Sequence, residues 1–181
     1  MRKTFYPLLL IAFLTPQLIY SQEALKPQLS PTAVVTARYK NTYLKITYSR
    51  PQKRGREIFG ELVPFGKVWR TGANEATEIT ITQDILINAI LLKAGTYSIF
   101  TVPDRIKWTI IVNRDVGLWG DYNYNPRTDV MRFDVAVETM NETYEPFTIA
   151  VEQNNDRAEM KMMWDKIKVT IPIRFLEEQQ K

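Results

Sequence analysis

Residues 130–137 read Val-Met-Arg-Phe-Asp-Val-Ala-Val, and this stretch decides the fold. The odd positions, from Met131 to Val137, all hold apolar residues, whereas the even positions include Arg132 and Asp134. Successive side chains of a β-strand point to opposite faces, so a period of two predicts a strand with one buried face. The stretch therefore predicts a half-buried strand.

Short runs of the same kind recur along the chain, each rich in β-branched or aromatic residues and bounded by turn residues. They lie at residues 33–38, 43–49, 77–82, 85–87, 90–92, 97–102, 108–113 and 147–152. Lys40-Asn41 separates the first two runs and is expected to turn them into a hairpin. Within residues 43–49, Leu44, Ile46 and Tyr48 share one face, and Thr47 lies on the other.

One segment, residues 158–167, fits two periods, because Met160 and Trp164 belong to both a helical stripe and an alternating strand. The residues that follow, 167–173, alternate clearly and predict a strand. We favour a hairpin that turns at Asp165-Lys166. Residues 58–63 contain Ile58 and Phe59, and one short helical turn is expected there to plug one end of the core.

Regularly spaced short strands without a long helix between them are typical of antiparallel sandwiches and barrels. The predicted fold class is all-β, an antiparallel, jelly-roll-like β-sandwich with at most one or two short helical turns. No repeat or linker divides the chain. We expect a single domain over residues 32–175, with an extended lead-in over residues 22–31 and a polar tail over residues 176–181.

The chain begins with an export pattern. Arg2 and Lys3 precede an apolar run that extends to about Tyr20, and Ser21 is a small residue at a plausible cleavage point. The run is too short and too interrupted for a membrane-spanning helix, which needs ~20 apolar residues. Residues 1–21 are therefore predicted to be a cleaved signal peptide, with an uncleaved anchor as the alternative. The product is expected in the periplasm or outside the cell, without membrane insertion after cleavage.

Composition excludes several kinds of chemistry. The chain has 0 cysteines and 0 histidines, so disulfides, lipid attachment to a cysteine, His/Cys zinc sites and Ser-His or Cys-His nucleophiles are absent. The formal net charge is only +4, and the basic stretch around Arg54 and Arg56 has no interleaved aromatic residues, so we expect a solvated loop and no nucleic-acid partner. No cofactor is expected.

Several blocks resemble one known family. Residues 62–77 contain Gly-Lys-Val-Trp-Arg-Thr-Gly-Ala-Asn-Glu-Ala, the longest and most specific of them. The others are residues 48–51, 55–60, 94–103 and 119–124. They resemble domain of unknown function 2911, which is found chiefly in exported bacterial proteins, and the resemblance runs from about Ser30 to Phe175. It implies a β-sandwich-like domain with no assigned activity. Some relatives carry an asparagine synthetase label. Glutamine-dependent amide transfer needs a cysteine nucleophile, and this chain has 0 cysteines, so the label does not fit it.

Residues 69–75 form the first candidate site. Trp69, Arg70, Asn74 and Glu75 place an aromatic ring, a cation, an amide and a carboxylate within seven residues of a loop between strands. Arg70 is a candidate for a two-pronged grip on a carboxylate or phosphate, and Asn74 and Glu75 for reading hydroxyl groups. Alternatively, Arg70 pairs with Glu75 and Asn74 caps the turn. Tyr97 is a further candidate for contact with the ligand.

Residues 119–126 form the second candidate site. Trp119, Tyr122 and Tyr124 offer flat apolar faces with polar tips on a turn-rich loop, which suits sugar rings or a partner surface. The alternative is that these rings cover one open end of the fold. The spacing of Asp121 and its neighbours also resembles the start of a calcium loop, but no glycine stands at the sixth position and no glutamate at the twelfth, so no metal site is predicted.

These features leave three hypotheses for function. The preferred one is a non-catalytic binding module for a small polar ligand or a glycan. The second is a carbohydrate-active hydrolase with paired carboxylates such as Glu75 and Asp121, which would have to lie ~5–9.5 Å apart. The third is a structural or protein-docking module of the cell envelope.

Overall fold

The computed structural model describes residues 28–176, and the predicted signal peptide (residues 1–21) lies outside them. These residues form nine antiparallel β-strands and a single 3-10 turn, so the prediction of an antiparallel all-β fold is confirmed. The elements are β1 Thr32–Tyr39, β2 Thr42–Ser49, β3 Thr77–Ile81, β4 Ile85–Ile87, β5 Ile90–Leu92, β6 Gly95–Pro103, β7 Lys107–Asn113, η1 Pro126–Thr128, β8 Asp129–Asn154 and β9 Arg157–Phe175.

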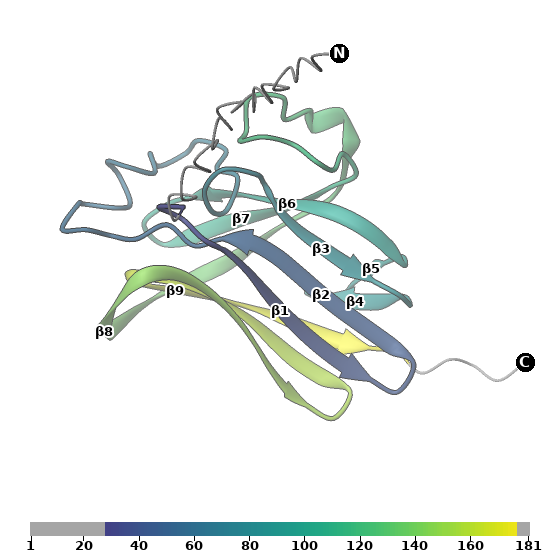
Figure 1. Cartoon of the computed structure of the whole chain (residues 1–181). Helices are drawn as coiled ribbons and strands as arrows, with labels where there is room; N and C mark the ends of the chain where they lie inside the picture. The colour runs from purple at the N-terminus through teal and green to yellow at the C-terminus, as the bar shows by residue number, and fades with distance from the viewer. Residues whose placement is uncertain (1–27, 177–181) are drawn as a thin grey trace, which may run out of the picture.

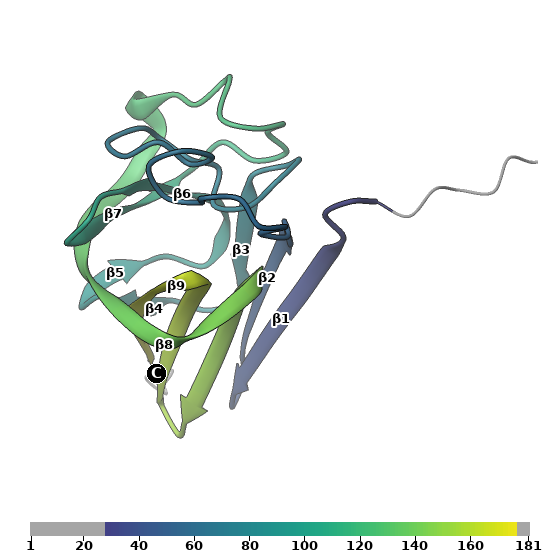
Figure 2. The ribbon, with the colours of Figure 1, turned by 90° about the vertical axis from the view of Figure 1, so that its left-hand side faces the viewer.

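The strands make one continuous sheet in the order β1-β2-β3-β6-β7-β8-β9-β4-β5, and this sheet folds over on itself (Figures 1 and 2). The fold is possible because β8 is long and bent. Residues 129–136 pair with β7 and residues from 137 onward pair with β9, with register irregularities between Thr139 and Thr148. The sequence pattern predicted two separate strands, at residues 130–137 and 147–152, and in the structure they are parts of one strand that continues through the bend.

Strand β9 also reverses direction. Nineteen extended residues would span about 60 Å, yet the Phe175 N–H donates to the Asp156 carbonyl at 2.7 Å, next to the start of the strand. Asp165, midway between them, has a left-handed φ of 55°. The chain therefore doubles back near Asp165, as the predicted hairpin at Asp165-Lys166 requires. The first predicted hairpin is also confirmed, because β1 and β2 pair along their whole length.

The predicted helical turn at residues 58–63 was wrong, because this segment is a loop. The Val63 N–H donates to the Ile58 carbonyl at 2.8 Å, five residues back, and Gly60 has a φ of 104°. Both features are incompatible with a regular helical turn. Ile58 and Val63 are nevertheless buried in the main core, so the segment does plug the fold.

The core lies between the two halves of the folded sheet and collects inward-facing residues from every part of it. Its centre is a cluster of aromatic rings in which Trp69 stacks on Trp164 with 5.9 Å between ring centroids. The Tyr48 hydroxyl links the two halves, because it accepts a hydrogen bond from the Ile149 N–H of β8 at 2.9 Å. These contacts hold one end of the fold in place, and both candidate loops leave from that end.

Candidate functional site

The last part of the connection between β2 and β3 is fixed by backbone hydrogen bonds; we call residues 69–77, which end with the first residue of β3, the Trp69 loop. Trp69 and Thr101 of β6 exchange two hydrogen bonds of 2.8 and 2.9 Å, and the Thr77 N–H donates to the Arg70 carbonyl. Thr71 and Asn74 both adopt left-handed φ angles, of 58° and 59°. A loop anchored at both ends with such strained residues presents its side chains in one fixed geometry.

Two of the predicted site residues lie in the core. Trp69 is 6% exposed, and its Nε1–H donates to the Gly72 carbonyl at 3.0 Å. Tyr97 is buried to a similar extent, and its hydroxyl donates to the Lys93 carbonyl. Trp69 thus supports its own loop from the core, whereas Tyr97 is bonded to the turn between β5 and β6. The prediction that they contact a ligand stays untested.

The loop from β7 to η1, here called the Trp119 loop (residues 114–125), lies beside the Trp69 loop. The Ala76 N–H donates to the Leu118 carbonyl and the Gly120 N–H to the Asn74 carbonyl, both at 2.9 Å. Glu75 and Trp119 also form an antiparallel bridge. Both loops rise from the same end of the sheet, at the top of Figure 2. The structure therefore brings together the two regions that sequence analysis selected separately.

The aromatic residues of the Trp119 loop divide into two groups. Trp119 is 60% exposed and Tyr122 is 82% exposed. Tyr124 instead packs on Phe100, and its hydroxyl donates to Asp129 at 2.7 Å. Burial, together with the hydrogen bond to Asp129, raises the pKa of the Tyr124 hydroxyl above its ordinary value. Trp119 and Tyr122 are the rings that present open faces to solvent.

A pocket of about 320 Å³ lies between the Trp119 loop and the outer face of β1, β2 and β3. We call it the shelf. Its polar lining consists of hydroxyl groups and two carboxylates, and the full set is Thr32, Thr47, Tyr48, Ser49, Glu75, Ala76, Glu78 and Gly117. Glu78 is held in place because its carboxylate accepts the Gly117 N–H at 2.7 Å. Glu75 is exposed, and its backbone pairs with that of Trp119, the residue with the exposed indole ring.

Asn74 and Arg70, the other two polar residues predicted for the Trp69 loop, do not line the shelf. The Asn74 side chain donates to the Ser30 carbonyl at 3.3 Å and to the Ser49 hydroxyl at 3.5 Å, so it tightens the loop rather than facing open solvent. Arg70 forms no ion pair with Glu75 among the described residues, against one of the alternatives from the sequence. Arg70 instead lines a second pocket beside the Trp69 loop.

Glu75 is the one shelf residue among the site residues predicted from the sequence. The other seven were missed, among them the polar side chains of Thr32, Thr47 and Ser49. A signal existed for one of them, because the alternation in residues 43–49 places Thr47 on the outer face. Its neighbour across the sheet is Glu78, through the pairing of β2 with β3. That pairing joins segments about thirty residues apart, and no local pattern reveals it.

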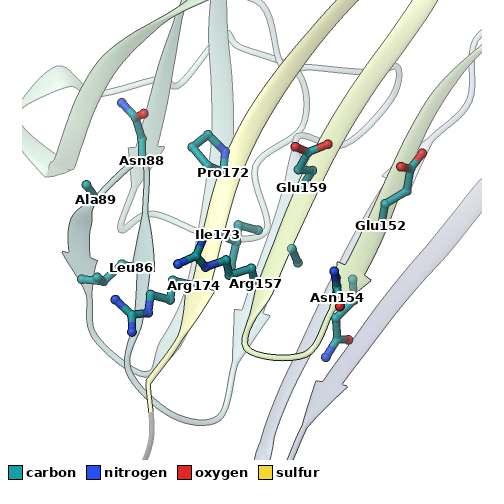
Figure 3. A pocket seen from close by; sticks show the side chains of 12 residues that line it. Leu86, Asn88, Ala89, Glu152, Asn154, Arg157, Glu159, Pro172, Ile173 and Arg174 are labelled. Carbon is teal, nitrogen blue, oxygen red and sulfur yellow. The ribbon is translucent and has the colours of Figure 1, made fainter.

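A larger groove of about 760 Å³ lies elsewhere, along β4, β9 and the second half of β8 (Figure 3). Its charged side chains are mostly paired with close neighbours. Glu152 and Glu159 both pair with Lys161, and Arg174 pairs with Asp156. None of the predicted site residues lines it, so it does not enter the candidate site.

Within residues 28–176, no three acidic side chains gather closely enough to hold a metal ion. Asn125, in the stretch whose spacing resembles the start of a calcium loop, caps η1, where its side chain accepts the Arg127 N–H. In the same part of the chain, no helix is long and apolar enough to cross a bilayer.

Comparison with known proteins gives one match. A family model described as a protein of unknown function (DUF2911) matches residues 30–173. No curated protein and no solved structure is detectably similar to the chain. The matched residues include both candidate loops and all nine strands but the last residues of β9. The chain therefore belongs to the DUF2911 family.

Proposed function

We propose that this protein is a non-catalytic binding module for a glycan, which it holds on the shelf against Trp119. The observation that carries the proposal is the bridge between Glu75 and Trp119. This bridge pairs the backbone of Trp119, whose indole is exposed, with that of Glu75, which lines the pocket.

This combination suits a sugar for two reasons. One face of a pyranose ring is apolar and packs on an aromatic ring, while its hydroxyl groups need hydrogen-bond partners. Ligand sites commonly combine an apolar surface with a few fixed polar groups. Trp119 supplies the surface, Glu78 is already fixed by Gly117, and Glu75 remains free at the rim. At about 320 Å³, the shelf is large enough for one or two sugar rings of a longer chain.

The binding test is isothermal titration of the full chain with a panel of neutral oligosaccharides: maltotetraose, cellotetraose, xylotetraose and chitotetraose. Trp119→Ala should weaken binding of the preferred sugar by about ten- to thirtyfold, as expected for a central aromatic contact. Ile106→Ala removes an exposed apolar side chain on the turn between β6 and β7 and should leave binding unchanged. Equal affinity of the Trp119→Ala variant and the parent for the panel would refute the proposal.

The shelf also favours one alternative, a carbohydrate-active hydrolase, because Glu75 and Glu78 line the same pocket. Asp121, the partner expected from the sequence, does not line it. The two functions separate on the fate of the sugar. A binding module leaves the oligosaccharide intact after long incubation, whereas a hydrolase shortens it and loses that activity in Glu75→Gln or Glu78→Gln.

We further propose that the module acts outside the cytoplasm, since residues 1–21 have the pattern of a cleaved signal peptide. N-terminal sequencing of the protein recovered from the periplasm or medium should start near Gln22. An intact Met1 on membrane-bound protein would contradict this.

A further inference from the structure

The second pocket beside the Trp69 loop is distinct from the shelf and is unusually basic. We call it the arginine pocket; it encloses about 240 Å³. Among residues 28–176, three arginines and no acidic residue line it. The full lining is Leu29, Ser30, Pro51, Gln52, Arg54, Arg56, Leu62, Val63, Trp69, Arg70, Gly72, Ala73 and Trp164.

Arg70 is the key residue of this pocket. Its Nε is buried without a hydrogen-bond partner, alone in this respect among the side chains of residues 28–176. Buried polar atoms nearly always have a partner, and each exception calls for an explanation. Leaving a charged donor unpaired in a water-poor site is costly. An anion bound beside the Arg70 guanidinium would offset part of this cost by pairing with its charge.

Arg54 and Arg56 are held toward the same space by backbone contacts. An Arg54 Nη2–H donates to the Leu29 carbonyl at 3.3 Å. Arg56 donates from Nε to the Lys53 carbonyl at 3.0 Å and from Nη2 to the Gln52 carbonyl at 2.5 Å. Each guanidinium has five N–H donors. Within residues 28–176, most donors of Arg54 and several of Arg56 have no other partner.

The neighbouring acidic groups do not neutralise the pocket. The Glu145 carboxylate accepts the backbone N–H of Arg54 at 2.6 Å, and Asp165 pairs with Lys53 at 2.8 Å. Neither Glu145 nor Asp165 lines the pocket. None of the three arginines that do line it forms an ion pair among the described residues. Three like charges around one small cavity repel one another until an anion is bound.

We propose that the arginine pocket binds an oxyanion, the carboxylate or phosphate group of a small molecule, with Arg70 at its base and Arg54 and Arg56 at its mouth. The planar guanidinium matches the geometry of both groups and forms paired, charge-assisted hydrogen bonds with them. The volume is below the roughly 300–1,000 Å³ of sites for whole drug-sized ligands, so it suits a small anion or the charged end of a larger molecule.

The experiment measures the thermal unfolding of the full chain in sodium phosphate and in sodium citrate, each against sodium chloride at equal ionic strength. Phosphate, citrate or both should raise the unfolding temperature, and the effective salt identifies the class of oxyanion. Titration should give an affinity that falls about tenfold or more in Arg70→Gln, the size of effect expected for a lost hydrogen bond to a charged group.

Two further variants keep the test decisive should Arg70→Gln fold poorly. Arg54→Gln/Arg56→Gln changes two exposed residues and should also weaken anion binding about tenfold while preserving the fold. Arg38→Gln/Arg127→Gln removes the same charge from two exposed arginines outside both candidate loops and should leave binding unchanged. The proposal is overturned if neither salt acts beyond chloride, or if both double variants lose binding equally. Neutral sugars serve as a separate probe, so failure here leaves the test of the shelf intact.

Discussion

Replacing Tyr48 with phenylalanine removes the hydroxyl that joins the two halves of the folded sheet, and it leaves the ring in place. The hydroxyl accepts the Ile149 N–H at 2.9 Å and lies 3.4 Å from the Ile149 carbonyl. Both residues are buried. The ring itself packs edge-on against Phe147, a contact that phenylalanine keeps.

Tyr48→Phe therefore leaves one buried backbone N–H without a partner, which costs about 1–3 kcal/mol of unfolding free energy. For a domain of this size, each kcal/mol lowers the midpoint of thermal unfolding by about 2–4 °C, so we expect a loss of about 2–12 °C. Thermal unfolding followed by circular dichroism measures it. Hydrogen exchange adds a local readout, because the Ile149 amide should exchange faster in the variant.

The matched control is Tyr122→Phe, which removes the same hydroxyl from a side chain that is 82% exposed. Its midpoint should stay within about 1 °C of the parent. If Tyr48→Phe behaves like this control and the Ile149 amide stays protected, the hydroxyl does not hold the two halves together and our reasoning about closure of the fold is wrong.

Two other changes test the loop and the surface charges. Gly72→Ala places a Cβ 3.0 Å from the Ser49 carbonyl oxygen, a backbone atom that cannot rotate away. The substitution should lower the unfolding free energy by about 1–3 kcal/mol. It should also weaken sugar binding and anion binding together, which titrations with both ligands measure. Asp134 accepts a hydrogen bond from Lys107, which holds the pKa of its carboxyl below the ordinary value. The resulting stability is present at neutral pH and is lost as the pH falls through the lowered pKa. Asp134→Asn should therefore be less stable than the parent at pH 7. The difference in unfolding free energy should be less than about 1 kcal/mol, because the ion pair is exposed. Near pH 2 the two proteins should be equally stable, and a constant difference between pH 7 and pH 2 would contradict the assignment.

Alternation of side chains carried most of the fold prediction, since a buried face imposes a period of two wherever a strand is half-covered. It located the strands at residues 33–49 and 130–137, and it favoured a turn at Asp165 over a helix. It could not show that β8 is one bent strand that belongs to both halves of the sheet. The bend depends on hydrogen-bonded pairing with β7 and with β9, and these pairings are not visible in the local pattern of β8. The loop at residues 58–63 was misjudged because Ile58 and Leu62, like Phe59 and Val63, are four residues apart, as on one face of a helix. The chain instead closes a wider turn, with a hydrogen bond from Val63 to Ile58, and buries both of these residues.

The candidate site was also predicted only in part from the sequence. The mixture of residue types singled out Arg70, Glu75 and Trp119, and the structure shows that the two loops containing them are hydrogen-bonded neighbours. The basic stretch with Arg54 and Arg56 was interpreted as a solvated loop. Its approach to Arg70 depends on a long-range packing that no local pattern encodes.

The most direct test of the glycan proposal is iodide quenching of tryptophan fluorescence, with and without a saturating oligosaccharide from the panel. Trp69, Trp108 and Trp164 are buried, and Trp119 is 60% exposed, so Trp119 should account for nearly all quenching. We expect the bound sugar to protect Trp119 and abolish most of the quenching, and we expect Trp119→Phe to show little quenching in either state. Unchanged quenching of the parent at saturating sugar would place the ligand away from Trp119 and contradict the proposed site.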